Sequence, residues 1–364
     1  MFKKIYIHNY KCFQNFEWNL EYEKSLLILG KNGAGKSTLL NTLKIFREIA
    51  HHENRLSVFF NKEDFYNKNV PIELGFVLDI EDLEYEYKLS ISYPEKFHEP
   101  KIEVEKLFVD NKIIYERDDD GIVLLDGVEF IIDWHSVALP TLFQRKTNSK
   151  SKEKIETVKQ YLVNMLFLAP IPSKISSDTY ADGRLLEKDA YNFCSWLNEI
   201  LNTEPSFYSD LIATLSKIMP DFNKFRFEDY GVFKQLNIVF TKEKAKLELS
   251  FDDLSDGEKL FFIFATIITL SKSEDKPFFC FWDEPENYIS LSLLQSLIQF
   301  FRAKIEFSSN NQLFFTSHNP EIMNVFSNEN IYYIYRDSHL SPARIKNMKE
   351  EKDSIVNLLK YGGI

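Results

Sequence analysis

The stretch Gly-Lys-Asn-Gly-Ala-Gly-Lys-Ser occupies residues 30–37 of a chain of 364 residues. Its spacing matches the pattern G-x-x-x-x-G-K-[ST], in which glycines let several backbone N–H groups point at one anion. An apolar run, Ser25–Leu29, precedes it, and a helical pattern follows from Lys36 to about Ile49. The start of such a helix adds partial positive charge to the loop. The sequence therefore predicts a phosphate-binding loop between a buried strand and a helix.

Two side chains of this P-loop have predicted roles. Lys36 would place a positive charge near the β- and γ-phosphates of a nucleotide, and the hydroxyl of Ser37 would be a ligand for Mg²⁺. A chance glycine-rich loop is the alternative, and the order of strand, loop and helix argues against it. We therefore expect ATP and Mg²⁺ as cofactors.

A second motif ends an apolar run near the other end of the chain. Phe278–Trp282 predicts a buried strand, and Asp283 and Glu284 follow it directly. In open α/β sheets, ligands bind at the carboxyl ends of the strands. We expect Asp283 to hold Mg²⁺ through its hydration shell and Glu284 to polarise the attacking water as a general base. An Asp-Glu pair is common by itself, and the prediction depends on its combination with the upstream P-loop.

Two further segments bear on the same chemistry. Leu-Ser-Asp-Gly-Glu at residues 254–258 precedes an apolar helical pattern, Asp256–Leu270. Ser255 and the N–H of Gly257 at a helix start would suit an anion, although an ordinary helix N-cap explains the same residues. Residues 314–318 predict a strand that ends in a histidine, His318.

With these motifs in this order, the chain resembles ABC-type ATPases of the SMC, RecF and OLD kind. Residues 254–258 resemble the signature motif of that group, and His318 matches its switch histidine, which contacts the γ-phosphate. Residues 5–13 resemble the opening strand of SMC and RecF-like ATPases, in which Lys11 and Phe13 would help to hold the nucleotide. Core packing for Phe13 and plain solvation for Lys11 stay open as alternatives.

The motifs and the resemblance together give the expected site. The catalytic residues are Glu284 and His318, and the metal ligands are Ser37 and Asp283. The expected nucleotide contacts are Lys11, Phe13, Gly30, Lys31, Asn32, Gly33, Ala34, Gly35, Lys36, Ser37, Thr38, Ser255 and Gly257.

The fold implied by the resemblance is an α/β ABC-type ATPase head with an antiparallel β-rich lobe and a helical insert. We expect one such head over residues 1–364, with an N-terminal lobe at 1–135, the insert at 136–225 and a C-terminal lobe at 226–364. Apolar and polar residues alternate through the β-rich part. Its expected strands are Ile72–Ile80, Tyr85–Ser92, Ile102–Val109, Lys112–Tyr115 and Ile122–Ile132. Helices are expected at Ala190–Leu201, Tyr208–Met219 and Leu291–Ile305, with strands between Phe225 and Phe251 and at Leu313–Thr316.

Composition limits the partners. The formal net charge of −11 gives the chain no general attraction to nucleic acid. The basic stretch Gln144–Lys159 is the only candidate contact, and its composition favours instead an exposed loop that leads into a helix. Three widely spaced cysteines fit neither a disulfide framework nor a zinc site. No apolar run is long enough to span a bilayer, so we expect a cytoplasmic protein without membrane contact.

The resemblance implies that two chains pair head to tail through ATP, as a homodimer or a higher oligomer. No nuclease motif is recognised in the sequence, which favours coupling to a partner effector, a nuclease or toxin, in anti-phage defence. The alternative is a DNA-repair or chromosome ATPase that clamps duplex DNA, so contact with DNA or RNA stays open. A transporter ATPase is disfavoured because no glutamine lies between Gln14 and Gln144. A binding module without turnover would follow if Glu284 were badly placed.

The match to the group departs from its usual pattern in two places. Asp256 and Glu258 stand where Gly and Gln are usual in the signature. The segment Glu286–Ser290 differs from the usual loop after the catalytic glutamate. These departures bear on dimer contacts and on the rate of hydrolysis.

Overall fold

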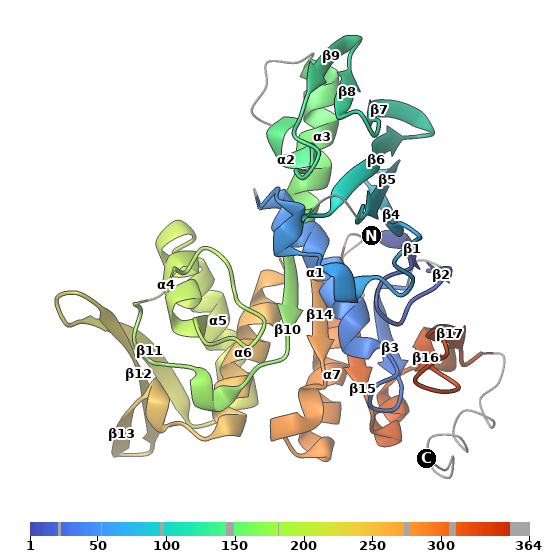
Figure 1. The fold of residues 1–364 in the computed structure, drawn as a ribbon. Coiled ribbons are helices and arrows are strands. Elements are labelled where there is room, and N and C mark those ends of the chain that lie inside the picture. The colour runs from blue at the N-terminus through green and yellow to red at the C-terminus, as the bar shows by residue number, and fades with distance from the viewer. Residues whose placement is uncertain are drawn as a thin grey trace. The chain divides into compact units, whose positions relative to one another are not determined.

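The computed structural model divides into two compact units (Figure 1). The first combines Met1–Met165 with Ser327–Ile364, and the second is Leu166–Phe326. The lobe boundaries expected at residues 135 and 225 stay predictions. The residues that the structure describes are 1–20, 23–51, 53–94, 98–142, 149–180, 182–272, 277–305 and 311–349.

An eight-stranded antiparallel sheet dominates the first unit, in the order β2-β1-β4-β5-β6-β7-β8-β9. Successive side chains of a strand point to opposite faces, so one face of this sheet is apolar and buried. The strands are β1 (Phe2–His8), β2 (Phe16–Asn19), β4 (Ile72–Ile80), β5 (Leu83–Ser92), β6 (Lys101–Val109), β7 (Lys112–Arg117), β8 (Ile122–Leu125) and β9 (Val128–Ile131).

Helices cover the buried face of this sheet. Helix α1 (Lys36–Ala50) inserts Phe46, whose ring centroid lies 4.9 Å from that of Phe76 on β4. The short α2 (Leu139–Leu142) leads to α3 (Ser149–Val163), and Tyr161 of α3 packs on Phe2 of β1 with the ring centroids 5.8 Å apart. Helix α1 therefore packs on the sheet, and the P-loop leads directly into its first turn.

Three shorter strands complete the first unit. The P-loop strand β3 (Ser25–Leu29) pairs in parallel with β16 (Ile331–Tyr335), which pairs antiparallel with β17 (Arg344–Asn347). Since β3 and β16 are parallel, the loops after both strands emerge at the same edge. This topology puts the β16–β17 connection beside the P-loop.

The predicted strand Ile122–Ile132 is wrong, because this segment is a hairpin of β8 and β9. Asp126 and Gly127 form its turn with φ angles of 51° and 77°. Two successive positive φ angles match the right-handed twist of the flanking strands, and Asp-Gly is a preferred pair there. The other predicted strands of the sheet are confirmed to within two residues at each end, and β2, β16 and β17 were not predicted.

The second unit contains a parallel core and a separate β meander. Within it β14 (Phe279–Asp283) lies between β10 (Met165–Leu168) and β15 (Gln312–Ser317), and β14 and β15 are parallel. The meander consists of β11 (Phe222–Asp229), β12 (Lys234–Lys242) and β13 (Ala245–Ser250). The helices are α4 (Phe193–Thr203), α5 (Phe207–Ile218), α6 (Asp256–Leu270) and α7 (Leu291–Ile305).

Packing in the second unit fixes the strand that carries the Asp-Glu pair. Every residue of β14 is buried, and the ring of Trp282 stacks on Phe264 of α6 at a centroid distance of 4.1 Å. Helix α4 begins at Phe193, three residues later than predicted, because Ala190 adopts a φ of 60°. A left-handed residue cannot continue a right-handed helix.

Candidate functional site

The P-loop has the backbone of an anion cradle. Gly33 and Gly35 adopt φ angles of 77° and 115°, a region that residues with a Cβ rarely enter. At Gly30 a Cβ would lie 2.6 Å from the carbonyl oxygen of Ile334, so only glycine fits there. Helix α1 begins at Lys36 with Gly35 as its N-cap and has no acidic residue in its first turn. An anion bound at this end would therefore meet no competing carboxylate from that turn.

The remaining P-loop residues differ in burial. Lys36 is 4% exposed, and its Nζ donates to the carbonyl oxygens of Gly30 at 2.8 Å and Lys31 at 3.3 Å. Lys31, Asn32 and Gly33 are exposed at the tip, as is Ser37. Ala34 is buried and Thr38 is half-buried.

Substitution of Gly35 by Ala is expected to weaken ATP binding about 10-fold or more. The new Cβ would lie 3.1 Å from the Sγ of Cys12 and would force an unfavourable φ, a strain of about 1–3 kcal/mol. Titration with a fluorescent ATP analogue measures the affinity. Gly127→Ala is the matched control, because Gly127 has φ 77° and nothing within 4 Å of an added Cβ. Equal affinities in the two variants would contradict the expected role of the loop.

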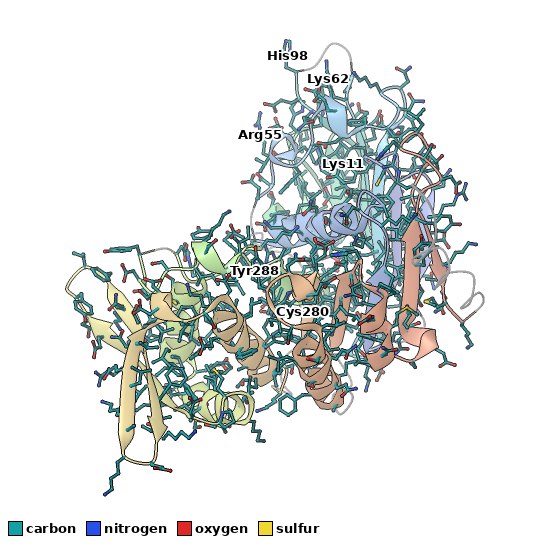
Figure 2. All side chains as sticks on the ribbon, turned by 90° about the horizontal axis from the view of Figure 1, so that it is seen from below. Lys11, Arg55, Lys62, His98, Cys280 and Tyr288 are labelled. Carbon is teal, nitrogen blue, oxygen red and sulfur yellow. The ribbon has the colours of Figure 1, made fainter. Side chains whose placement is uncertain are left out.

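The opening segment, residues 5–13, packs against the P-loop through Phe13. Phe13 is fully buried against Phe16, at a centroid distance of 4.6 Å, and a Cβ on Gly35 would lie 3.4 Å from its ring. This position favours packing under the loop over stacking on a base. Lys11 (Figure 2) is partly exposed, and its Nζ lies 3.5 Å from Asp64 Oδ1. The Lys11 ammonium therefore has a carboxylate partner in Asp64.

The connection between β16 and β17 also contacts the P-loop, and the motifs gave no sign of it. Arg336 donates from Nη1 to the carbonyl oxygen of Gly33 at 3.5 Å and from Nε to that of Ser341 at 2.9 Å. Ala343 N donates to Cys12 O at 2.7 Å. These bonds tie the connection to both the P-loop and the opening segment, and only the pairing of β3 with β16 reveals that proximity.

In the second unit, Asp283 and His318 come from the carboxyl ends of neighbouring parallel strands. Asp283 pairs in register with Thr316, and Asp283 Oδ1 accepts from Thr316 Oγ1 at 2.5 Å. Asp283 is 7% exposed, so its carboxylate is rigidly held at the strand end. Lys188 Nζ lies 3.8 Å from Asp283 Oδ2. The sequence gives no sign of this role for Lys188, because the residue belongs to no motif.

Asn192 explains how Lys188 is held there. This buried side chain accepts from Glu187 N at 3.0 Å and donates to the carbonyl oxygens of Asp182 at 2.9 Å and Leu185 at 2.8 Å. It therefore closes the loop that presents Lys188.

Glu284 and His318 lie together at the same edge. Glu284 has a φ of 49°, and its N–H donates to the carbonyl oxygen of Thr316 at 3.2 Å and to Thr316 Oγ1 at 3.1 Å. His318 Nδ1 lies 3.6 Å from Glu284 Oε1, and both side chains are partly exposed. The structure thus brings Asp283, Glu284 and His318 to one strand edge of the second unit.

In the segment that resembles the signature motif, Ser255 is hydrogen-bonded to the side chain of Glu258. Ser255 is the N-cap of α6, and its Oγ donates to Glu258 Oε2 at 2.7 Å. The N–H of Ser255 also donates to Glu258 Oε2, at 2.8 Å. This is a capping box, the ordinary N-cap that the sequence left open as an alternative. The hydroxyl of Ser255 already donates its hydrogen bond to Glu258, so a phosphate that approached this helix end would have to compete with that carboxylate. Gly257, next to it, is half-buried.

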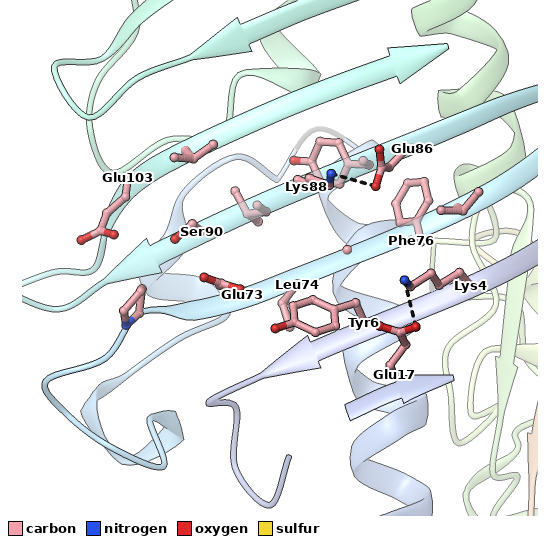
Figure 3. Close-up of a pocket in the computed structure, with 16 residues that line it drawn as sticks. Lys4, Tyr6, Glu17, Glu73, Leu74, Phe76, Glu86, Lys88, Ser90 and Glu103 are labelled. Atoms are coloured by element: carbon pink, nitrogen blue, oxygen red, sulfur yellow. Dashed lines mark ion pairs between the residues drawn. The ribbon is translucent and has the colours of Figure 1, made fainter. Parts of the chain in front are cut away.

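The outer face of the large sheet carries a second group of polar side chains. A cavity of about 590 Å³ lies on the outer face of the large sheet, where Lys4 pairs with Glu17 at 3.0 Å and Lys88 with Glu86 at 2.9 Å (Figure 3). These charges neutralise one another in pairs. Among the described residues, no cluster of three or more His, Cys, Asp or Glu side chains forms a metal site. A P-loop Mg²⁺ needs only a hydroxyl and a carboxylate, with phosphates and waters as its other ligands, so Ser37 and Asp283 suit it chemically.

The basic stretch 144–159 divides between two parts of the chain. Residues 144–148, which include Arg145 and Lys146, lie outside the described residues. Lys150, Lys152, Lys154 and Lys159 lie on α3, so the predicted helix follows as expected. Within the described residues, none of the helices is long and apolar enough to cross a membrane.

Comparison with known proteins gives two family matches. Residues 133–324 match the family described as "AAA domain, putative AbiEii toxin, Type IV TA system", and residues 1–127 match the AAA ATPase domain family. No protein of curated function matches the chain significantly.

Among solved structures, heads of SMC proteins are similar over nearly the whole chain. One is an SMC head bound to the C-terminal winged-helix domain of ScpA, with 14% identity, a TM-score of 0.58, and coverage of 97% of this chain and 99% of that one. Another is the Pyrococcus furiosus SMC head with an extended coiled coil, bound to the C-terminal domain of ScpA. It has 13% identity and a TM-score of 0.57, and covers 99% of this chain and 100% of that one. The α/β ABC-type ATPase head fold predicted from the sequence is thereby confirmed.

Proposed function

The chain belongs to this AbiEii-related family of AAA domains, and on that premise we propose that it binds Mg²⁺–ATP and hydrolyses it as a head-to-tail pair of chains. One observation carries the proposal. The P-loop has an anion-binding backbone at the start of α1, and Asp283, Glu284 and His318 converge at the strand ends of β14 and β15. In this proposal each unit would supply one group of the residues that phosphoryl transfer needs, a reaction in which positioning and charge do most of the work.

Each residue has a role in this proposal. Lys36 would exchange its two carbonyl acceptors for phosphate oxygens, and the N–H groups at residues 33–37 would hold the β-phosphate. Ser37 and Asp283 would hold Mg²⁺, which when bound neutralises charge that develops on the phosphates. Glu284 would accept a proton from the attacking water, and His318 would contact the γ-phosphate.

Pairing of two chains would use the signature segment. The γ-phosphate held by one chain would meet Ser255 and the α6 N-terminus of the other, and it would have to displace the carboxylate of Glu258. Hydrogen bonds to charged groups contribute about 1.5–3 kcal/mol each, so loss of the γ-phosphate weakens such a pair strongly. ATP state would then control association.

Ser255→Arg is expected to abolish ATP-dependent pairing while ATP affinity stays within about twofold of wild type. Arginine would fill the space that the γ-phosphate needs. Glu258→Gln is expected to strengthen pairing, because it removes the competing negative charge. Analytical ultracentrifugation with and without ATP measures the pairing, and Ser216→Arg, on the exposed face of α5, is the control. Unchanged pairing in Ser255→Arg would exclude the head-to-tail arrangement.

We further propose that the ATP state is coupled to a partner effector protein, a nuclease or a toxin, in anti-phage defence. The description of the family as a Type IV toxin–antitoxin system supports this role. The DNA-clamp alternative depends on the basic stretch Gln144–Lys159, of which four lysines lie on α3, and the net charge of −11 argues against it. Salt-dependent DNA binding that disappears when those lysines are neutralised would favour the clamp.

A further inference from the structure

Glu286 is a largely buried acid beside the two proposed catalytic side chains, and no motif assigns it a role. It lies in the turn η5 (Pro285–Tyr288), and its side chain is 9% exposed. Its Oε1 accepts from Ser317 Oγ at 2.5 Å and from His318 N at 3.4 Å. Glu286 therefore links the turn after β14 to the end of β15.

The second carboxylate oxygen is unusual. Within the described part of the chain, Glu286 Oε2 is buried and has no hydrogen-bond partner. Burial raises the pKa of the Glu286 carboxyl, and the bond from Ser317 opposes this shift. Burial of a carboxyl group with an unsatisfied oxygen costs free energy. If Glu286 only joined the turn to β15, a neutral hydrogen-bonding side chain would do so at a lower cost.

His318 lies between two carboxylates. Its Nδ1 is 3.6 Å from Glu284 Oε1 and 3.6 Å from Glu286 Oε1. Both separations are longer than a hydrogen bond, and catalytic bonds commonly tighten only when the substrate binds. A histidine whose Nδ1–H is held by a carboxylate presents Nε2 as its free ring nitrogen.

We propose that Glu286 is a positioning residue, which with Ser317 orients the ring of His318 so that Nε2 is presented to the γ-phosphate. In this arrangement Glu286 accepts the Nδ1–H of His318, and Glu284 accepts the proton of the attacking water. This inference rests on the ATPase function proposed above. The inference goes beyond that function, because it assigns the turn after the Asp-Glu pair a role in setting the tautomer of His318.

A double-mutant cycle between Glu286 and His318 tests the coupling. Glu286→Ala is expected to lower kcat about 10- to 100-fold, the usual effect of losing such an orienting carboxylate, while ATP affinity stays within twofold. Glu286→Gln retains Oε1 and is expected to restore most of the rate. In a His318→Ala background, Glu286→Ala is expected to change kcat less than about threefold. Glu321→Gln, an exposed acid close in sequence, is the control.

Nitrogen-15 NMR of the His318 ring tests the same idea without catalysis, with His318→Ala used to assign the signal. The Nδ1–H tautomer is expected to dominate in wild type and Glu286→Gln, and to mix with the Nε2–H form in Glu286→Ala. An unchanged tautomer ratio, or an equal loss of kcat in both backgrounds, overturns the inference. A tautomer change in a protein that hydrolyses no ATP would instead refute the proposed function and leave the positioning role standing.

Discussion

Glu284→Gln is expected to lower the rate of ATP hydrolysis about 100- to 10,000-fold and to leave ATP binding intact. Gln cannot accept the proton of the attacking water, and general-base catalysis contributes a factor of this size. The substitution preserves shape, and the backbone of Glu284 is held by two bonds from its N–H to Thr316. The effect should therefore be on kcat alone.

Single-turnover phosphate release, together with titration of an ATP analogue, separates these two quantities. Lys36→Ala is the contrasting variant, since it removes the charge near the phosphates and is expected to abolish binding itself. Phosphate release by Glu284→Gln at the wild-type rate would assign the base to another group. Absence of turnover in wild type would favour a binding module.

Glu105→Leu is expected to destabilise the first unit by about 3–5 kcal/mol, because it leaves a buried charge uncompensated. Glu105 on β6 is fully buried and accepts from Tyr115 Oη at 2.8 Å, Tyr87 Oη at 3.1 Å and the N–H groups of Ala138 at 2.7 Å and Leu139 at 2.9 Å. The guanidinium of the buried Arg117 lies 4.0 Å away. All of these groups would lose their anionic partner.

Urea unfolding followed by circular dichroism measures this loss. Glu116→Leu is the matched control on the neighbouring strand β7, because Glu116 is exposed and pairs with Lys106 at 3.2 Å. Surface pairs of this kind contribute about 0–1 kcal/mol. Similar stabilities for the two variants would show that the Glu105 cluster does not hold the sheet to α2.

Local sequence patterns predicted the parts of the fold that depend on neighbours along the chain. The strands β3 and β4 were predicted to the residue, because an apolar or alternating run bounded by turn residues leaves few choices. The P-loop and the Asp-Glu strand end were likewise readable, since each motif lies within a few residues. The hairpin of β8 and β9 was missed, although Asp126-Gly127 is a strong turn signal.

Features that depend on distant pairing were not readable from the sequence. Arg336 reaches Gly33 only because β16 pairs with β3, and Lys188 reaches Asp283 only through the loop closed by Asn192. In the sequence, Glu286 stands out only as a departure from the usual loop after the catalytic glutamate, and no local pattern predicts its contact with Ser317. For Ser255, the sequence could not distinguish an anion contact from a helix cap, and the cap is what the structure contains.

The pairing of β3 with β16 has a consequence for the newborn polypeptide. Leu27 to Leu29 pair with residues 331–333, so the strand that precedes the P-loop lacks this partner until those residues emerge from the ribosome. Contacts separated by so much chain form slowly and late. Nascent chains that carry the P-loop but lack this strand would therefore have an incomplete cradle, and we expect ATP to bind only after β16 has been synthesised.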